Sequence, residues 1–321
     1  MSSTKDLRIS TEEIAEARRA LRGVAWRTPL LPASRDEEHV FLKLECLQRT
    51  GSFKIRGAWN RMSRVDSPGL RRGFVTTSAG NHGQAVAWCA RKLGARCVVH
   101  VPDNAVQRKV DSILSMGAEV VKKPHEEIME SMTDDRLQKL GMTYIHPFGD
   151  RQVMAGQGTV GLEVLEDMPD VRSVVVPVGG GGLINGIAFA LKGRKPTISI
   201  YGVQAEGAAP LPKSLASGRA EDMGHPRTIA DGIAATRVFD YMLPLFRENV
   251  DGVLTVSDEE IRYSMRHLAS ECHVVAEPAG AASLAAVRKY RERLQGPVVA
   301  VVSGGNCDPS LLSDAVLKSA P

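Results

Sequence analysis

Three short segments carry the residues whose types and spacing suit chemistry, and the first is a run of glycines, Gly179–Gly182, before a helix predicted over Gly186–Lys192. Glycines let backbone amides converge on an anion, and a helix N-terminus adds a favourable dipole, so this loop predicts a phosphate site. For an isolated glycine run, a flexible turn is the commoner explanation. The loop lacks both the Walker A and the Gly-x-Gly-x-x-Gly pattern, which indicates a phosphorylated ligand other than a nucleotide.

The second segment is Ser78–Gln84, which follows a predicted strand and opens a predicted helix. Asn81 is suited to the N-cap of that helix, and Ser78 with the turn amides can receive a carboxylate there. A capped turn without a ligand explains Asn81 and the glycines equally well. It does not explain why small polar residues are so dense in this loop.

The third segment places Lys54 between Phe53 and Ile55 at the start of a predicted helix. A lone lysine is usually a solvated surface charge, but a desolvated lysine has a lowered pKa and becomes a nucleophile toward carbonyls. Lysine, phosphate loop and carboxylate loop together suit one cofactor, pyridoxal 5′-phosphate, holding an amino acid. The alternatives are a binding module for a phosphorylated metabolite and a dehydrogenase, against which the missing nucleotide pattern counts.

These segments need a scaffold of alternating strands and helices. Several β-branched runs end in a glycine-rich or polar turn and lead into a helical pattern, which predicts an α/β fold. Some runs are apolar on both faces, as in a parallel sheet covered by helices. Capping boxes at Ser10–Glu13 and Ser257–Glu260 mark two helix starts. The predicted strands are Val40–Leu44, Gly73–Thr77, Cys97–Val101, Ala118–Val121, Thr143–Ile145, Ser173–Val178, Ile198–Val203 and Val298–Val302.

A repeated feature indicates how the chain divides into domains. Gly94, Gly117 and Gly141 each close a predicted helix and open a predicted strand, at spacings of 23 and 24 residues. Glycine at such a position suits a left-handed helix C-terminus. We therefore predict a small domain over residues 63–147 and a discontinuous large domain built from residues 1–62 and 148–321.

Composition excludes several classes of protein. The chain has 321 residues, 43% of them apolar and 24% charged, which is typical of a globular protein. A formal net charge of +4 without a clustered basic face predicts no nucleic-acid partner, and no apolar run approaches the length of a membrane span. Five dispersed cysteines without a Cys-x-x-Cys pair predict reduced thiols and a cytoplasmic location.

Taken in order, the motifs resemble those of the fold-type II pyridoxal-phosphate enzymes, within them the threonine/serine dehydratase and serine racemase branch. The resemblance implies two open, mostly parallel twisted sheets flanked by helices, the tryptophan-synthase-β-like architecture, in a large and a small domain. It also implies a homodimer. The motifs are Arg27–Leu30, Leu42–Glu45, Thr50–Ala58, Ser78–Gln84, His146–Phe148, Gly156–Thr159, Gly179–Gly182, Ala276–Gly280 and Ser303–Asn306.

The resemblance also implies a role for individual residues. Lys54 would form the Schiff base with the cofactor and shuttle protons. Asn81 would contact the cofactor's 3′-oxygen, and Ser303 would hydrogen-bond the pyridine nitrogen. The remaining implied cofactor contacts are Phe53, Gly179, Gly180, Gly181, Gly182, Leu183 and Gly232. The substrate carboxylate would be received by Ser78, Asn81 and His82.

Within the branch, the sequence favours elimination over racemisation. Racemisation needs an acid or base on the second face of the substrate, and Ala79 stands where racemases have a serine. Ser303 is a hydroxyl rather than a carboxylate, so the pyridine nitrogen stays largely unprotonated, which also suits elimination. The implied activity is a lyase that removes water and ammonia from L-threonine or L-serine. Serine racemase and dehydratases of 3-hydroxyaspartate or an aryl-serine are the alternatives.

A divalent cation is left open by the sequence. Glu206 matches the first ligand of the cation site that the resemblance implies for the racemases. Pro212 stands at the second ligand position and offers neither a carboxylate nor an N–H. A hydrated Mg²⁺ held by one carboxylate is compatible with this pattern.

Overall fold

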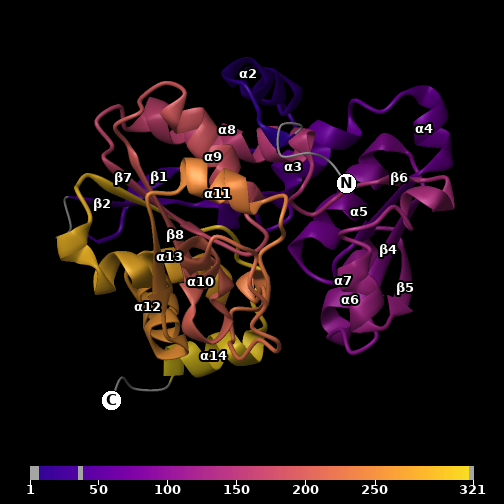
Figure 1. Cartoon of the computed structure of the whole chain (residues 1–321). Coiled ribbons are helices and arrows are strands. Elements are labelled where there is room, and N and C mark those ends of the chain that lie inside the picture. The colour runs from indigo at the N-terminus through magenta and orange to yellow at the C-terminus, as the bar shows by residue number, and fades with distance from the viewer. Residues whose placement is uncertain (1–6, 35–38, 318–321) are drawn as a thin grey trace.

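The computed structural model describes residues 7–34 and 39–317, which form two sheets flanked by helices (Figure 1). The larger sheet has six strands in the order β1-β2-β10-β7-β8-β9, and only β1 pairs with its neighbour in the antiparallel direction. The smaller sheet has four strands in the order β5-β4-β3-β6, all of which are parallel. The predicted α/β class and the two mostly parallel sheets are therefore confirmed.

The strands agree closely with those predicted from apolar, β-branched runs, and each predicted strand is present with its ends shifted by a few residues. The strands are β1 (Leu30–Pro32), β2 (Val40–Lys43), β3 (Phe74–Thr77), β4 (Cys97–Pro102), β5 (Glu119–Lys123), β6 (Thr143–Tyr144), β7 (Ser173–Pro177), β8 (Ser199–Ala205), β9 (Gly252–Val256) and β10 (Val298–Val301). The sequence analysis missed β1 and β9. Both are edge strands with partly exposed residues, so they lack the continuous apolar signal of a covered strand.

The helices connect the strands and cover the sheets. They are α2 (Thr11–Ala20), α3 (Lys54–Met62), α4 (Ser67–Arg72), α5 (Asn81–Leu93), α6 (Gln107–Ser115), α7 (His125–Glu130), α8 (Arg151–Asp167), α9 (Gly182–Lys192), α10 (Pro210–Ser217), α11 (Leu243–Asn249), α12 (Asp258–Ser270), α13 (Pro278–Lys289) and α14 (Pro309–Leu317). Among the described residues, none of these helices is long and apolar enough to cross a bilayer.

The predicted local signals at helix ends are confirmed. Ser10 and Ser257 each accept a hydrogen bond from the backbone N–H three residues on, and the glutamate at that position closes the capping box. Gly94, Gly117 and Gly141 have φ angles of +66°, +87° and +75°, the left-handed conformation that favours glycine. Each therefore turns the chain from a helical segment toward the next strand.

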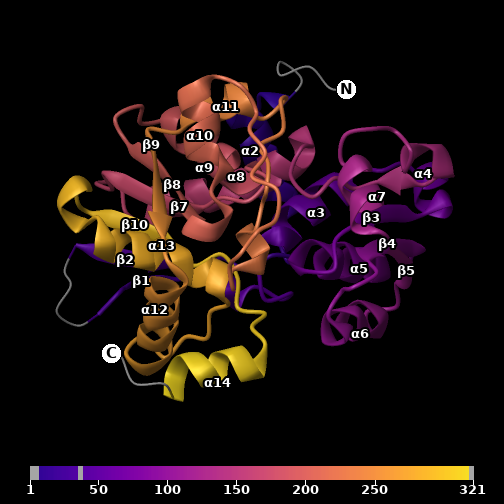
Figure 2. The ribbon, with the colours of Figure 1, turned by 60° about the horizontal axis from the view of Figure 1, so that its bottom comes forward.

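Helix α3 lies between the two sheets in both views (Figures 1 and 2). Ile55, Ala58 and Met62 of this helix are fully buried in the same apolar cluster as Phe74 and Val99 of the smaller sheet. The same helix contacts α8, which belongs to the layer over the larger sheet. Helix α3 therefore joins the two parts of the molecule, and the predicted domain boundary at residue 62 stays a prediction.

A buried cluster of charged side chains holds α3 in this position. The Arg56 guanidinium donates to both oxygens of Glu45 at 2.8 and 2.7 Å and to both oxygens of Glu163 at 2.7 and 2.9 Å. Lys43, whose side chain is fully buried, lies 2.6 Å from Glu163 and donates to the Thr28 carbonyl. Two cations thus face two carboxylates, so the cluster is electrically balanced inside the protein.

Removing the cation at position 56 should unbalance this cluster. We expect Arg56→Met to lower the free energy of unfolding by about 3–5 kcal/mol, because Glu45 and Glu163 would be left buried with too few partners. The matched control is Arg96→Met, which removes a bidentate pair with Glu119 whose side chains are more than half exposed. That change should cost about 1 kcal/mol or less. Urea unfolding of both variants measures the difference, and equal losses would contradict this account.

Candidate active site

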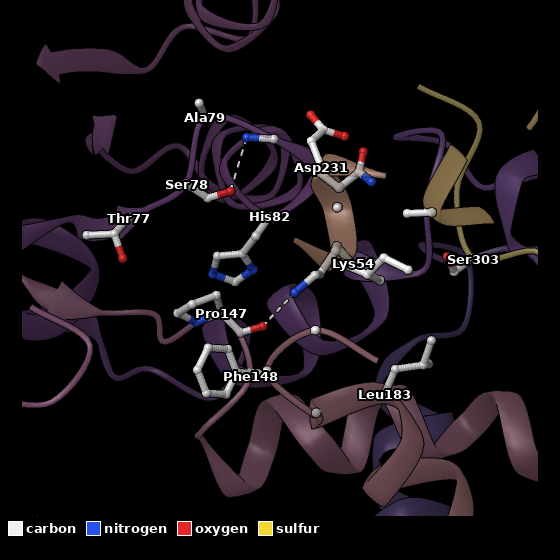
Figure 3. A pocket seen from close by; sticks show the side chains of 18 of the residues that line it. Lys54, Thr77, Ser78, Ala79, His82, Pro147, Phe148, Leu183, Asp231 and Ser303 are labelled. Carbon is white, nitrogen blue, oxygen red and sulfur yellow. Dashed lines mark hydrogen bonds between the residues drawn. The ribbon is translucent and has the colours of Figure 1, made fainter. Parts of the chain in front are cut away.

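A cavity of about 380 Å³ opens between the two sheets, where the predicted loops converge (Figure 3). Ser78 follows β3, Gly179 follows β7 and Ser303 follows β10, so all three lie beyond the carboxyl ends of parallel strands. Open α/β sheets bind their ligands at this edge. Every residue predicted to contact the cofactor or the substrate carboxylate lines this one cavity, although the predicted roles themselves remain predictions.

Lys54 begins helix α3 and extends into the cavity (Figure 3). Its Nζ donates to the Pro147 carbonyl at 2.7 Å. Because the side chain is desolvated, the pKa of Lys54 is lowered to about 8. The amine is thus neutral at a much lower pH than an exposed lysine, as a nucleophilic amine requires.

The turn that carries Pro147 is held by the ring of His146. Its Nδ1 accepts from the Gly149 N–H at 2.8 Å, which leaves the proton on Nε2, 3.1 Å from the Met132 carbonyl. Burial lowers the pKa of His146 to about 4, so the ring is neutral. The sequence analysis assigned no role to His146. Its motif was noticed, but the burial that makes it a structural acceptor depends on the tertiary fold.

The glycine loop is shaped by aromatic neighbours. A Cβ at Gly180 would lie 2.2 Å from the Phe148 ring, and one at Gly181, where φ is +92°, would lie 2.3 Å from Phe246. Helix α9 begins at Gly182 rather than at the predicted Gly186, so the glycines themselves form its first turn. Its first backbone hydrogen bond runs from Asn185 to Gly181, and the preceding amides are left for an anion.

The loop after β3 differs from its prediction in one respect. Asn81 is the first residue of α5, Gly80 occupies the N-cap, and no side chain caps the helix. The prediction of Asn81 as the N-cap is therefore wrong. Its side chain instead donates from Nδ2 to Glu277 Oε1 at 2.6 Å and accepts at Oδ1 from Asn306 at 2.7 Å. Long-range partners thus replaced the local backbone partner that the sequence indicated.

His82 is buried beside the cavity as a neutral ring (Figure 3). Its Nε2 donates to the Ile145 carbonyl at 3.0 Å, and Nδ1 has no hydrogen-bond partner among the described residues. Desolvation and the nearby Lys54 hold the pKa of His82 well below its usual range. The ring therefore has no N–H left for a carboxylate. Any contact of His82 with a substrate carboxylate would use its backbone N–H at the start of α5.

Ser303 and Phe53 join the cofactor side of the cavity to Lys54. The Phe53 N–H donates to the Ser303 carbonyl at 3.1 Å, which brings the segment before α3 against the end of β10. Gly232 lies opposite, in the short 3-10 helix Asp231–Ile233, where a Cβ would approach Ala279 to 2.9 Å. The cavity also contains residues to which the sequence analysis gave no role, among them Glu277, Asn306 and Lys109.

Glu206 lies outside the cavity, where Lys289 Nζ donates to it and to Glu260 at 2.9 Å each. An ammonium group thus already lies between the two carboxylates. Residues 7–34 and 39–317 contain no group of three or more His, Cys, Asp or Glu side chains arranged to hold a metal. The predicted cation at Glu206 has no support in this arrangement and stays untested.

Comparisons with known proteins agree with this geometry. The family model described as "Pyridoxal-phosphate dependent enzyme" matches residues 21–304. An L-threonine ammonia-lyase of Thermotoga maritima is 41% identical over 97% of this chain and 79% of its own length. A serine racemase of Dictyostelium discoideum is 36% identical over 95% of this chain and 97% of its own. The chain therefore belongs to the pyridoxal-phosphate-dependent enzyme family.

A solved structure shows the same fold. A threonine deaminase of the organism abbreviated T.th. superimposes with a TM-score of 0.86 at 37% identity, covering 94% of this chain and 99% of that one. The chain is thus an enzyme of the ammonia-lyase type, a lyase with fold-type II architecture.

The cavity fits pyridoxal phosphate on its own evidence. The glycines of residues 179–182 form a cradle that side chains would fill, next to the unused amides that begin α9. A desolvated amine, Lys54 Nζ, lies in the same cavity. Together these features match an anionic phosphate and an aldehyde carbon on one ligand.

The lowered pKa of Lys54 predicts how the cofactor-free protein captures the cofactor. The rate constant for covalent capture should rise about tenfold per pH unit up to about pH 8 and then level off, because the neutral amine reacts and forms above its pKa. Stopped-flow absorbance of the cofactor-free protein mixed with pyridoxal phosphate between pH 6 and 10 measures this. A rate that still rises through pH 10 would show an ordinary, solvated lysine.

Proposed function

We propose that this protein catalyses β-elimination of L-threonine, L-serine or both, releasing a 2-oxo acid and ammonia. The observation that carries the proposal is the convergence of three features in one cavity: a desolvated lysine amine, a glycine cradle and a helix N-terminus with free amides. The threonine ammonia-lyase and threonine deaminase to which the chain is similar support the same reaction.

Each feature has a part in this reaction. Pyridoxal phosphate, when bound through Lys54, withdraws electrons from the amino acid's Cα. The amides that begin α9 bind its phosphate, and Ser303 offers a hydroxyl to its ring nitrogen. The backbone amides that begin α5 orient the substrate carboxylate. Once released from the cofactor, Lys54 Nζ takes up the proton from Cα, which a pKa near 8 permits at neutral pH.

The lining of the cavity favours substrates without a second carboxylate. Ile128, Met129 and Met132 supply an apolar wall, and Phe148 adds an aromatic one. No arginine belongs to the described lining. Lys109 lines the cavity but forms an ion pair with Asp231, so its charge is already partnered. These features support threonine or serine over 3-hydroxyaspartate.

Racemisation is the second candidate, because serine racemases are among the similar proteins. Ala79 lines the cavity beside Ser78 and offers only a methyl group on that side. A methyl group cannot deliver a proton to the second face of Cα. The alanine therefore supports elimination as the main reaction.

Location and assembly complete the proposal. All five cysteines are free thiols, which supports residence in a reducing compartment, the cytoplasm. The homodimer that the sequence motifs imply remains part of this proposal.

A substrate panel tests the reaction. Ammonia and 2-oxo acid release should be greatest with L-threonine or L-serine and lower with 3-hydroxyaspartate. Lys54→Ala should lower kcat at least about a thousandfold, since the proton acceptor is removed. Lys213→Ala, which removes an exposed lysine, is the control and should leave kcat unchanged. Wild-type rates in Lys54→Ala would refute the assignment of Lys54.

Chiral analysis separates the two candidate reactions. Incubation of the purified enzyme with L-serine should yield pyruvate and ammonia with little D-serine, because Ala79 supplies no proton. We expect Ala79→Ser to increase D-serine formation relative to elimination. Rapid D-serine formation by the unmodified enzyme would establish a racemase instead.

A further inference from the structure

Glu277 is a buried carboxylate at the edge of the cavity that local structure does not require. It occupies the N-cap of α13, yet its side chain makes no capping hydrogen bond there. Its Oε1 instead accepts from Asn81 Nδ2 at 2.6 Å. Only 6% of the residue is exposed, so a carboxylate is kept from water for the sake of this contact.

Asn306 determines which way the Asn81 amide points. Asn306 Nδ2 donates to the Thr50 carbonyl at 2.8 Å and to Asn81 Oδ1 at 2.7 Å. A backbone carbonyl can only accept, so the NH₂ group of Asn306 must face Thr50 and Asn81. Asn81 Oδ1 therefore faces Asn306, and the NH₂ group of Asn81 faces Glu277. This NH₂ group has two hydrogens, of which Glu277 takes one.

Glycines make room for this network. A Cβ at Gly304 would lie 2.2 Å from Glu277 Oε1 and 3.2 Å from Asn81 Nδ2. A Cβ at Gly51 would lie 2.2 Å from Asn306 Oδ1. The Glu277 N–H also donates to the Gly304 carbonyl at 3.1 Å. Backbone from three distant segments is thus packed against the side-chain amides, which leaves them no alternative arrangement.

We propose that Glu277 and Asn306 are positioning residues, which fix the Asn81 amide so that its second N–H is presented to the ring oxygen of pyridoxal phosphate. The inference rests on the proposed binding of this cofactor in the cavity. Glu277 acts as a hydrogen-bond acceptor and not through its charge. Burial raises the pKa of its carboxyl while the bond from Asn81 opposes that rise, and an acceptor oxygen is present in either protonation state.

The test uses the cofactor and an analogue that lacks the 3′-hydroxyl, 3-deoxypyridoxal phosphate, each titrated into cofactor-free protein. We expect Glu277→Leu to weaken binding of pyridoxal phosphate about tenfold and to shift the absorbance of the bound cofactor, because the Asn81 amide is released. Glu277→Gln keeps an acceptor oxygen and should remain within about threefold of the wild type. With the analogue, wild type and Glu277→Leu should bind equally.

A double-mutant cycle with Asn81 and a distant control complete the design. In an Asn81→Ala background, Glu277→Leu should have no further effect on cofactor affinity, since its action passes through Asn81. The control is Asp258→Leu, which removes a carboxylate that accepts from Thr228 outside the cavity, and it should leave the absorbance unchanged.

Several results would overturn the inference. One is an equal loss with both ligands in Glu277→Leu, which would place the effect elsewhere than at the ring oxygen. Others are a loss in Glu277→Gln as large as in Glu277→Leu, or a wild type that does not distinguish the two ligands. Failure of the proposed function is seen separately. If all variants bind as expected but no amino acid releases ammonia, the positioning role stands and the proposed reaction does not.

Discussion

The balanced charge cluster around Arg56 is the interaction on which the position of the active lysine depends. Arg56 lies two residues after Lys54 on the same helix, and its guanidinium is held by Glu45 on one side and Glu163 on the other. Such a cluster contributes little net stability, but it is costly to break and permits few arrangements. It thereby holds the start of α3 in the interior, where the Lys54 amine loses its hydration and its pKa falls.

Glycines let the helices around that lysine approach closely. A Cβ at Gly57 of α3 would lie 2.4 Å from Gln157 of α8, and a Cβ at Gly156 would lie 2.5 Å from the Arg56 carbonyl. A Cβ at Gly186 of α9 would lie 2.5 Å from the Met154 carbonyl of α8. Helices α3, α8 and α9 therefore pack backbone to backbone. This packing sets the distance from the glycine loop, at the start of α9, to Lys54, at the start of α3.

Burial rather than charge pairing governs the titratable groups of the cavity. Desolvation is the main cause of the lowered pKa values of Lys54, His82 and His146 and of the raised pKa of Glu277. Both histidines donate from Nε2 to a backbone carbonyl, so their tautomers are fixed by the main chain. A site built in this way keeps a nucleophilic amine near neutral pH without a permanent cation beside it, which suits a reaction that moves protons at Lys54.

The sequence by itself determined the α/β class, the covered strands, the capping boxes at Ser10 and Ser257 and the loops that meet in the cavity, because these depend on local patterns of apolar residues, glycines and caps. Tertiary structure alone decided the edge strands β1 and β9, the partner of Glu206 and the orientation of Asn81. Sequence reasoning placed Asn81 at a helix N-cap, since nearby backbone is the partner that local spacing can predict. Its actual partners, Glu277 and Asn306, are 196 and 225 residues away. Which polar groups meet at such separations depends on how the sheets and helices pack, and a buried amide takes the partners that packing supplies.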